Sequence, residues 1–382
     1  MGDIGPDFGF GLYIHWPYCA RICPYCDFNV YAAKDRDTEP LIAAMIADLE
    51  AQRRRLPAHP AVDSIFFGGG TPSLMSAAQM GAVLDKVNDT YGIAPGAEIT
   101  LEANPNDILR SDIKSWADTG INRLSIGVQS LRDDALGFLG RDHDSGQARK
   151  AIDAAQTVFD NHSLDLIYAR PGQSPDDWGT ELAEVLSLGA PHLSLYELTI
   201  EARTAFGQRA ARGDLVPMQD DDQADLYELT QTICDSAGLP AYEVSNHARA
   251  PEFESRHNHI YWASGDWLGI GPGAHGRLSI GSDRIATEAP RRPIDYKLDQ
   301  STADTCLSHT DTIREFVPMA LRPVKGLDLT RFERVVGSAP APEVIEDLVS
   351  NNLAKVENDT LALTVAGRLM ADYIASLLVP HE

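Results

Sequence analysis

Three cysteines near the start of the chain have a spacing that could bind iron or zinc. Cys19, Cys23 and Cys26 lie in the run YCARICPYCDFN as C-x3-C-x2-C, far from Cys234 and Cys306. A structural zinc site uses four ligands, usually as two pairs, and this chain has one triplet. Three thiolates on a four-iron cluster leave one iron open to a small molecule. The spacing therefore favours an iron–sulfur cluster over the zinc alternative, and we expect Cys234 and Cys306 to be small buried apolar side chains.

The segments that must position these cysteines alternate between two patterns. Short apolar, β-branched segments recur, and helix-periodic segments separate most of them; they span residues 12–16, 62–67, 98–103, 123–128, 163–168 and 192–198. Such alternation is typical of βα units on a parallel sheet. Ligands of such sheets bind at the carboxyl ends of the strands, and the triplet directly follows the first segment. The periodicity allows either a barrel or an open doubly wound sheet.

The composition is that of a folded protein with a large acidic surplus. Of 382 residues, 43% are hydrophobic and 23% charged, and the net charge is −24. This surplus argues against nucleic acid or an anionic membrane surface as the main partner. No apolar run reaches the roughly 18 residues of a transmembrane segment, and the first residues lack the pattern of a secretory signal. We therefore expect a cytoplasmic protein.

The triplet and its surroundings resemble the signature of radical S-adenosylmethionine (SAM) proteins. That signature has an aromatic residue before the third cysteine, here Tyr25, and the longer run GLYIHWPYCARICPYCDFN looks like the coproporphyrinogen III oxidase-like branch. The resemblance covers nearly the whole chain. It implies an α/β fold with a partial (β/α)6 TIM-like barrel and a mainly helical C-terminal domain. It also implies a [4Fe–4S] cluster on Cys19, Cys23 and Cys26, with SAM at the open iron.

The resemblance further implies a set of SAM-contacting residues in the barrel. Alone, each would more often be structural, but several follow or end a predicted strand and come in the expected order. The expected SAM contacts are Tyr13, Tyr25, Gly69, Gly70, Thr71, Glu102, Gln129, Arg141 and Asp165. One departure is Arg170, where relatives often carry Leu; it either covers the barrel rim or reaches a carboxylate of the substrate or of haem. No catalytic residue is assigned.

Three features within this branch favour its haem-chaperone group over the oxidase. The oxidase has a further cysteine two residues after the triplet, and this chain has Phe28 there. The run HNHIYW matches the H-N-x-x-Y-W motif of the chaperone group. Only 18 residues precede Cys19, whereas the oxidase has a long N-terminal extension. The resemblance thus implies a haem chaperone, with oxygen-independent coproporphyrinogen III oxidase or another radical SAM enzyme as the alternative.

The H-N-x-x-Y-W motif suggests where haem binds. A haem site needs an axial ligand and an apolar wall for the macrocycle. His257 can supply the ligand, and Tyr261 and Trp262 can supply the wall. Nearby histidines are alternative ligands, and a basic group is expected for the haem propionates; these candidates are His247, His259, His275 and Arg256.

Three regions are expected along the chain. Residues 1–240 would form the barrel, 241–300 an extension with the motif, and 301–382 a helical domain with a small hairpin in NNLAKVENDTLALT. The expected partners are haem, haem-accepting respiratory proteins at the membrane, an electron donor for the cluster and, as an alternative to a monomer, a second copy. No nucleic acid and no transmembrane segment are expected.

Overall fold

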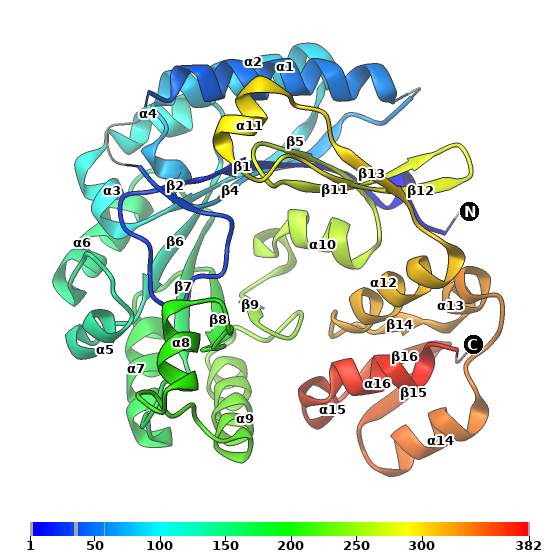
Figure 1. Cartoon of the computed structure of the whole chain (residues 1–382). Coiled ribbons are helices and arrows are strands. Elements are labelled where there is room, and N and C mark those ends of the chain that lie inside the picture. Colours follow the sequence, from blue (N-terminus) through cyan, green and yellow to red (C-terminus); the bar gives the residue numbers. More distant parts are fainter. Residues whose placement is uncertain (1–2, 34–36, 57, 381–382) are drawn as a thin grey trace.

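A strongly curved sheet organises the structure, a computed structural model that describes residues 3–33, 37–56 and 58–380 (Figure 1). Among these residues the sheet has eleven strands in the order β13-β12-β11-β10-β1-β4-β5-β6-β7-β8-β9. Its parallel part comprises β1 (Phe10–Trp16), β4 (Val62–Gly69), β5 (Ile93–Ala103), β6 (Arg123–Gln129), β7 (His162–Tyr168), β8 (His192–Glu197) and β10 (Asp266–Ile270). The six predicted strand segments are β1 and β4–β8, and the expected partial (β/α)6 barrel is confirmed.

Helices cover the convex face of the sheet. The helices that follow the parallel strands are α1 (Glu39–Arg55), α2 (Ala77–Tyr91), α3 (Pro105–Arg110), α4 (Ile113–Asp118), α5 (Asp133–Phe138), α6 (Ser145–Gln156), α7 (Pro175–Ser187), α8 (Ala205–Ala211) and α9 (Asp220–Ser236). Side chains alternate between the two faces of a strand. On β6, Leu124, Ile126 and Val128 join the main apolar core. The intervening residues of β6 line an inner cavity, and this polar lining sets the barrel apart from one filled with apolar side chains.

The segment after α9 extends the same sheet and places one helix on its inner face. The antiparallel strands are β9 (Asn246–Ala248), β11 (His275–Ile280), β12 (Asp283–Glu288) and β13 (Ala303–Cys306), and α11 (Pro293–Leu298) lies outside against α1. Helix α10 (Arg256–Trp262), which carries the HNHIYW run, packs on β1 and β4 at the open side of the barrel (Figure 1). The domain boundaries near residues 240 and 300 stay a prediction.

The C-terminal residues form a second, mainly helical core. It contains α12 (His309–Leu321), α13 (Leu329–Val336), α14 (Pro342–Ser350), α15 (Val365–Leu369) and α16 (Ala371–Leu378), with a small sheet of β14 (Leu327–Asp328), β15 (Ala354–Glu357) and β16 (Thr360–Leu363). Strands β15 and β16 pair antiparallel, as the predicted hairpin requires. Helix α12 also packs against α10, which joins this core to the barrel.

The two isolated cysteines lie in different surroundings. Cys234 is buried in α9, and burial raises the pKa of its thiol to about 12, as expected for an inert apolar side chain. Cys306 is exposed on β13. The prediction that Cys306 is buried is therefore wrong, because β13 is the edge strand of the sheet and all four of its residues face solvent.

Candidate functional site

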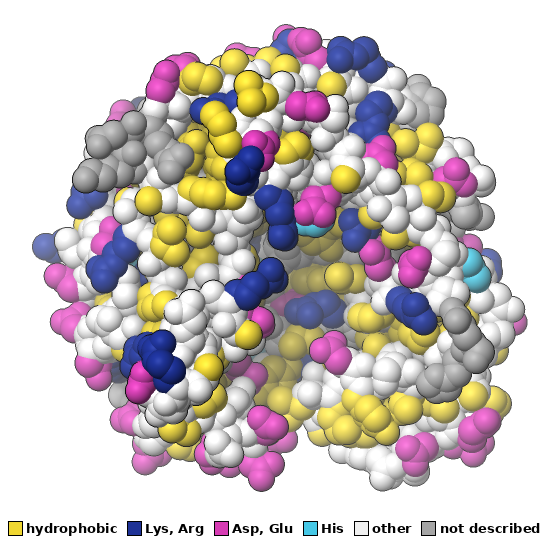
Figure 2. Space-filling view, in the orientation of Figure 1, with side chains coloured by type: hydrophobic (Ala, Val, Ile, Leu, Met, Phe, Trp, Pro, Cys, Tyr) yellow, Lys and Arg dark blue, Asp and Glu magenta, His cyan; other side chains and the backbone are white. Residues whose placement is uncertain are grey.

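A cavity of about 640 Å³ occupies the inside of the barrel. The three cysteines line its upper end, beyond the carboxyl ends of the parallel strands, and its floor reaches the first residues of α10. Figure 2 shows the opening as a hollow in the middle of the molecule, with Lys and Arg side chains around its rim. The volume lies within the range of about 300–1,000 Å³ that small-molecule sites occupy.

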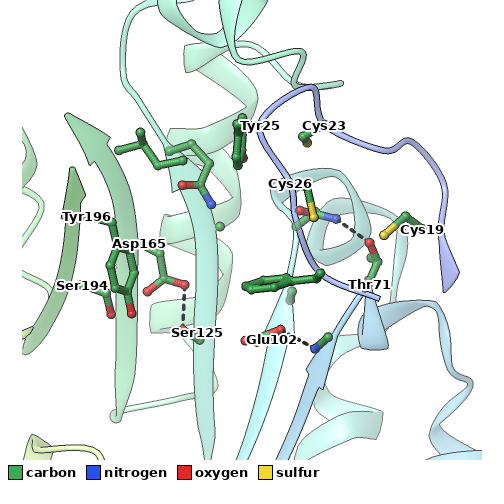
Figure 3. Close-up of a pocket in the computed structure, with 18 of the residues that line it drawn as sticks. Cys19, Cys23, Tyr25, Cys26, Thr71, Glu102, Ser125, Asp165, Ser194 and Tyr196 are labelled. Atoms are coloured by element: carbon green, nitrogen blue, oxygen red, sulfur yellow. Dashed lines mark hydrogen bonds between the residues drawn. The ribbon is translucent and has the colours of Figure 1, made fainter. Parts of the chain in front are cut away.

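The cysteine loop begins where β1 ends. A short parallel pair, β2 (Tyr18–Cys19) with β3 (Tyr31–Ala32), closes the base of the loop. Figure 3 shows the three thiols on one side of the cavity, with Asp165 and Tyr196 across from them. Within the described residues, no three His, Cys, Asp or Glu side chains converge on one metal ion. A single zinc ion needs such convergence at about 2.0–2.3 Å, whereas a cluster spreads its thiolates over several irons, so this donor set fits a [4Fe–4S] cluster better than zinc.

Asn29, three residues after the last cysteine, fixes the loop to a distant part of the chain. Its side-chain amide donates hydrogen bonds of 2.9 Å to the Pro272 carbonyl and 2.8 Å to the Arg291 carbonyl. Its own carbonyl bonds the His15 ring at Nε2, 3.0 Å away. The run GIGPGAHG, which contains Pro272, therefore supports the cysteine loop, a role that the sequence did not indicate.

The glycine run at the end of β4 also supports the cysteine loop. Gly70 donates a hydrogen bond of 2.7 Å to the Trp16 carbonyl, and a Cβ on Gly70 would lie 2.7 Å from the Tyr18 carbonyl oxygen. Gly69 has φ +107°, and its Cβ would lie 2.6 Å from the His15 ring. These glycines are thus required by the close approach of β4 to β1 and the loop. The sequence interpretation had ascribed them to the approach of a ligand. Gly69, Gly70 and Thr71 nevertheless line the cavity.

Two carboxylates, from the strands on either side of β6, face the cavity. Glu102 on β5 accepts a hydrogen bond of 3.1 Å from the Gly69 N–H. Burial, together with the charge of Asp165, raises the pKa of Glu102 to about 8. Asp165 on β7 accepts hydrogen bonds from Ser125 (2.7 Å) and Ser163 (2.9 Å), although burial still raises its pKa. A cation in the cavity beside these carboxylates would be stabilised by ionised Glu102, and SAM carries a sulfonium and an ammonium.

Arg141 links the cysteine loop to the strands. One terminal nitrogen donates to Cys23 Sγ and to the Tyr25 hydroxyl, both at 3.4 Å, and the other donates to the Gly127 carbonyl at 3.0 Å. Gln129, at the end of β6, lines the cavity with φ +66°. The structure therefore brings Tyr25, Gln129 and Arg141 to the upper end of the cavity.

Tyr13 lies behind the cavity wall. It sits on the inner face of β1, but the ring of Phe66, which lines the cavity, stacks on it with centroids 6.3 Å apart. The Tyr13 hydroxyl hydrogen-bonds the His15 ring at 3.1 Å. Of the nine expected SAM contacts, Tyr13 is the one that the structure does not bring to the cavity lining.

None of the three expected haem residues lines the cavity. His257 is 2% exposed, and both ring nitrogens are engaged, Nδ1 with Ser64 Oγ at 2.7 Å and Nε2 with the Tyr261 hydroxyl at 2.6 Å. Burial lowers the pKa of His257 to about 3, so the imidazole is neutral. The Trp262 ring packs against Tyr242. Ligation of haem by His257 would require both hydrogen bonds to break, and it stays a prediction.

The alternative haem candidates differ in accessibility. His247 is fully buried, His259 bonds Glu254 at 2.6 Å, and His275 is exposed on β11. The guanidinium of Arg256 donates to the Gly96 carbonyl at 2.7 Å. Of the three histidines, His275 is therefore the most open imidazole.

Arg170 has a structural role. It is buried and donates hydrogen bonds of 2.7 Å to Glu181 and 2.8 Å to the Ile167 carbonyl. Both partners belong to the barrel itself. This geometry answers the question that the sequence left open, because these two bonds commit the guanidinium to the protein and direct it away from a ligand.

The cavity floor contains residues that the sequence analysis missed. Arg123 begins β6, and Asn258 follows the motif histidine in α10; both line the cavity. The other missed polar residues of the lining include Ser125, His192, Ser194, Asn246 and Ser255. A signal for some of them was present, because polar residues occupy alternate positions of β6 and β8, which indicates a polar inner face.

A hydrogen-bonded chain joins the cavity to the start of α10. Ser163, which donates to Asp165, bonds His192 Nδ1 at 2.8 Å, and His192 Nε2 bonds the Tyr242 hydroxyl at 2.8 Å. That hydroxyl accepts from the N–H of Ser255, the N-cap of α10, at 3.1 Å. The position of the HNHIYW helix is thus tied to a carboxylate of the cavity.

Comparisons with known proteins agree with this geometry. The Radical SAM superfamily matches residues 13–184. The chain is 35% identical to the "Heme chaperone HemW" of Mycobacterium tuberculosis over 97% of its own length and 95% of the relative, and 34% identical to that of Escherichia coli K12 over 96% and 97%. A zebrafish (Danio rerio) protein named for its radical S-adenosyl methionine domain, "mitochondrial", is 32% identical over 95% of this chain and 85% of its own.

A solved structure with a similar fold is coproporphyrinogen III oxidase (HemN) from Escherichia coli, described as a radical SAM enzyme. It superposes with a TM-score of 0.79 over 97% of this chain and 90% of its own, at 20% identity. At this identity the likeness concerns the fold. No helix among the described residues is both long and apolar enough to cross a bilayer.

Proposed function

Because the chain belongs to the HemW family of radical SAM proteins, we propose that it is a haem chaperone that binds haem and passes it to haem-accepting proteins. Its cofactors are a [4Fe–4S] cluster and SAM, as in the superfamily. One structural observation supports this function most directly. The cysteine loop and the helix of the HNHIYW run contribute to the same cavity.

In this proposal each end of the cavity has its own task. Cys19, Cys23 and Cys26 hold the cluster, which supplies an iron with an open coordination position. Glu102 and Asp165 orient the cationic part of SAM, Arg141 meets its carboxylate, and the other lining residues among the expected set complete that site. Haem binds near α10. The proteins that accept this haem are respiratory proteins at the membrane. The chain acts alone or as a homodimer.

The binding test uses the protein after anaerobic reconstitution of its cluster. Haem is titrated and followed by the Soret band, and the loaded protein is then mixed with an apo-globin as a generic acceptor. We expect stoichiometric haem binding and transfer at a rate faster than that from serum albumin. Absence of haem binding by the reconstituted protein would refute the chaperone function.

The axial ligand is identified by a parallel series of variants. The structure makes His257 a neutral but hydrogen-bonded imidazole and leaves His275 exposed. His257→Ala, His259→Ala and His275→Ala are compared by Soret position and by cluster content. If His275→Ala is the only variant that loses the axial ligand, the haem site lies at β11 and not at α10.

The alternative function is oxidation of coproporphyrinogen III. The observation that favours this alternative is the similarity of the fold to that of HemN. Phe28 occupies the position of the oxidase's additional cysteine, at the mouth of the cavity with 63% of its surface exposed. A phenyl ring cannot replace a thiol. We therefore expect no conversion of coproporphyrinogen III, and product formation by the reconstituted protein would favour the oxidase.

A further inference from the structure

Arg123 is a buried cation whose hydrogen-bonding capacity the protein leaves unused. It is 2% exposed at the first position of β6 and lines the cavity floor. Its closest ion-pair contact is from Nε to a Glu98 carboxylate oxygen, at 3.7 Å. Within the described part of the chain, the buried Nε has no acceptor and the guanidinium makes no hydrogen bond. A guanidinium offers five donors, and leaving them unpaired when buried is unfavourable.

Glu98 balances the charge of Arg123, but the hydrogen bonds of its carboxylate go to the start of α10. Its Oε1 accepts hydrogen bonds from the backbone N–H groups of Arg256 (3.1 Å) and His257 (3.4 Å) at the start of α10. Glu98 therefore holds the helix, while the donors of Arg123 remain available on the cavity side. The pair differs from Arg170 and Glu181, whose hydrogen bond is 2.7 Å.

The other polar groups around the floor leave room for an acceptor on a ligand. Asp165 already accepts from two serines, and His192 is neutral because burial lowers its pKa and both its nitrogens are bonded. Asn258 lines the same floor, and none of the described residues forms a hydrogen bond with its side-chain amide. A guanidinium and an amide that form no side-chain hydrogen bond among the described residues thus line the same cavity.

We propose that Arg123 and Asn258 form a binding site for a carboxylate group of a ligand at the floor of the cavity. Guanidinium and carboxylate match in geometry and form strong paired hydrogen bonds. The identity of the ligand rests on the proposed haem-chaperone function, since haem carries two propionates. SAM also carries a carboxylate and is the other source of this group.

The position of Arg123 favours the propionate over SAM. Arg123 and Gln129 are the first and last residues of β6. Six residues of strand span about 20 Å, and the cysteine loop lies beyond the Gln129 end. A SAM molecule held at the cluster would place its amino-acid carboxylate at that upper end, far from Arg123. The lower site is therefore suited to a different carboxylate.

The experiment compares acids with matched ligands that lack the carboxylate. Reconstituted wild-type protein, Arg123→Gln and Arg123→Lys are titrated with haem and haem dimethyl ester, and separately with SAM and decarboxylated SAM. We expect the wild type to bind haem at least tenfold more tightly than the ester. Arg123→Gln should reduce this ratio to near one, and Arg123→Lys should retain part of it.

Two control variants separate ligand binding from structural support. Glu98→Gln removes the ion-pair partner of Arg123, and Arg212→Gln removes an exposed guanidinium at the C-cap of α8. Both should keep the preference for haem over its ester. Cluster content and circular dichroism show whether each variant is folded. If Arg123→Gln does not fold, the ratio of haem affinity to ester affinity in the wild type and in Arg123→Lys decides whether the carboxylate site exists.

Each result has a defined meaning. An equal affinity of the wild type for haem and its ester, with unchanged SAM discrimination in the Arg123 variants, would overturn the carboxylate site. Loss of discrimination between SAM and decarboxylated SAM in Arg123→Gln would keep the site but make SAM its ligand. If the wild type binds no haem, the chaperone function fails, and the SAM titrations alone decide whether Arg123 binds a carboxylate.

Discussion

The upper and lower ends of the cavity are built from different kinds of structure. At the upper end, the cysteines lie on a loop after β1, and backbone contacts of the glycine run hold that loop in place. At the lower end, the polar groups come from strands and from α10, and most bond one another. Loops can adapt to a cofactor that enters after folding, whereas strands hold side chains at fixed positions. This difference supports the proposal that the upper end holds the cofactors and the lower end recognises the ligand.

The largest expected effect tests the upper end. Cys19→Ala, Cys23→Ala and Cys26→Ala should each abolish the stable [4Fe–4S] cluster, because each removes one of three thiolate ligands. Iron and sulfide analysis with the absorbance near 400 nm measures the loss. Cys306→Ala is the matched control, since this thiol is exposed and distant. Full cluster content in any triplet variant would contradict the assignment.

A second effect tests the carboxylate below the cluster. Glu102→Gln should weaken SAM binding at least tenfold, because the variant cannot provide a negative charge to the sulfonium or ammonium. In the wild type, SAM affinity should rise between about pH 6.5 and 8.5, because binding must ionise a carboxyl whose pKa is about 8. Calorimetric titration at several pH values measures both, and the variant should show a flat profile.

The same variant should have the opposite effect on stability. The pKa of Glu102 in the folded protein lies above its ordinary value of 4.5, so the unfolded state binds fewer protons in this interval and stability falls from pH 4.5 to 8. Without SAM, Glu102→Gln should therefore raise Tm at pH 8 more than at pH 5. Asp165 is the titratable group whose charge acts on Glu102, and the charge of Glu102 in turn contributes to the raised pKa values of Tyr13, Tyr261, Tyr196 and Cys19. A lower Tm at pH 8 would contradict the burial effect.

A third effect tests how firmly the lower end is held. His257→Ala removes the partner of both Ser64 and Tyr261 in a buried region and should lower the free energy of unfolding by about 2–4 kcal/mol. Chemical denaturation measures it. His275→Ala, an exposed histidine, should change stability by less than about 0.5 kcal/mol. Equal effects of the two variants would show that His257 is not a structural anchor of α10.

The smallest expected effect concerns the N-cap of α10. The Ser255 hydroxyl accepts a hydrogen bond from the Asn258 N–H, and Ser255→Ala should cost about 1 kcal/mol. Thr204→Ala, which removes the N-cap of α8, is a matched control with a similar cost. If the lower end recognises haem, Ser255→Ala should also weaken haem binding, whereas Thr204→Ala should not. Similar haem affinities of the two variants would show that haem recognition does not depend on the position of α10.

The sequence predicted the upper end of the cavity better than the lower end. Motif spacing and strand ends indicated the cysteines, Glu102 and Gln129 because loops after parallel strands meet at one edge of a sheet. Arg123 was missed because its environment depends on Glu98, which comes earlier in the chain, and on α10, which begins only at Arg256. The motif could not predict the buried hydrogen bonds of His257. In a sequence, a histidine whose ring bonds two protein groups looks the same as a histidine whose ring is free to bind a ligand.

The anchors of Asn29 also bear on how the protein is made. The two carbonyls that its amide bonds lie 243 and 262 residues further along the chain. During translation, the thiols leave the ribosome long before Pro272 and Arg291 have been synthesised. The loop can reach its final conformation only when three quarters of the polypeptide is available, since domains order as their contacting segments emerge. We therefore expect the cluster site to become complete only after the chain has been synthesised as far as Arg291.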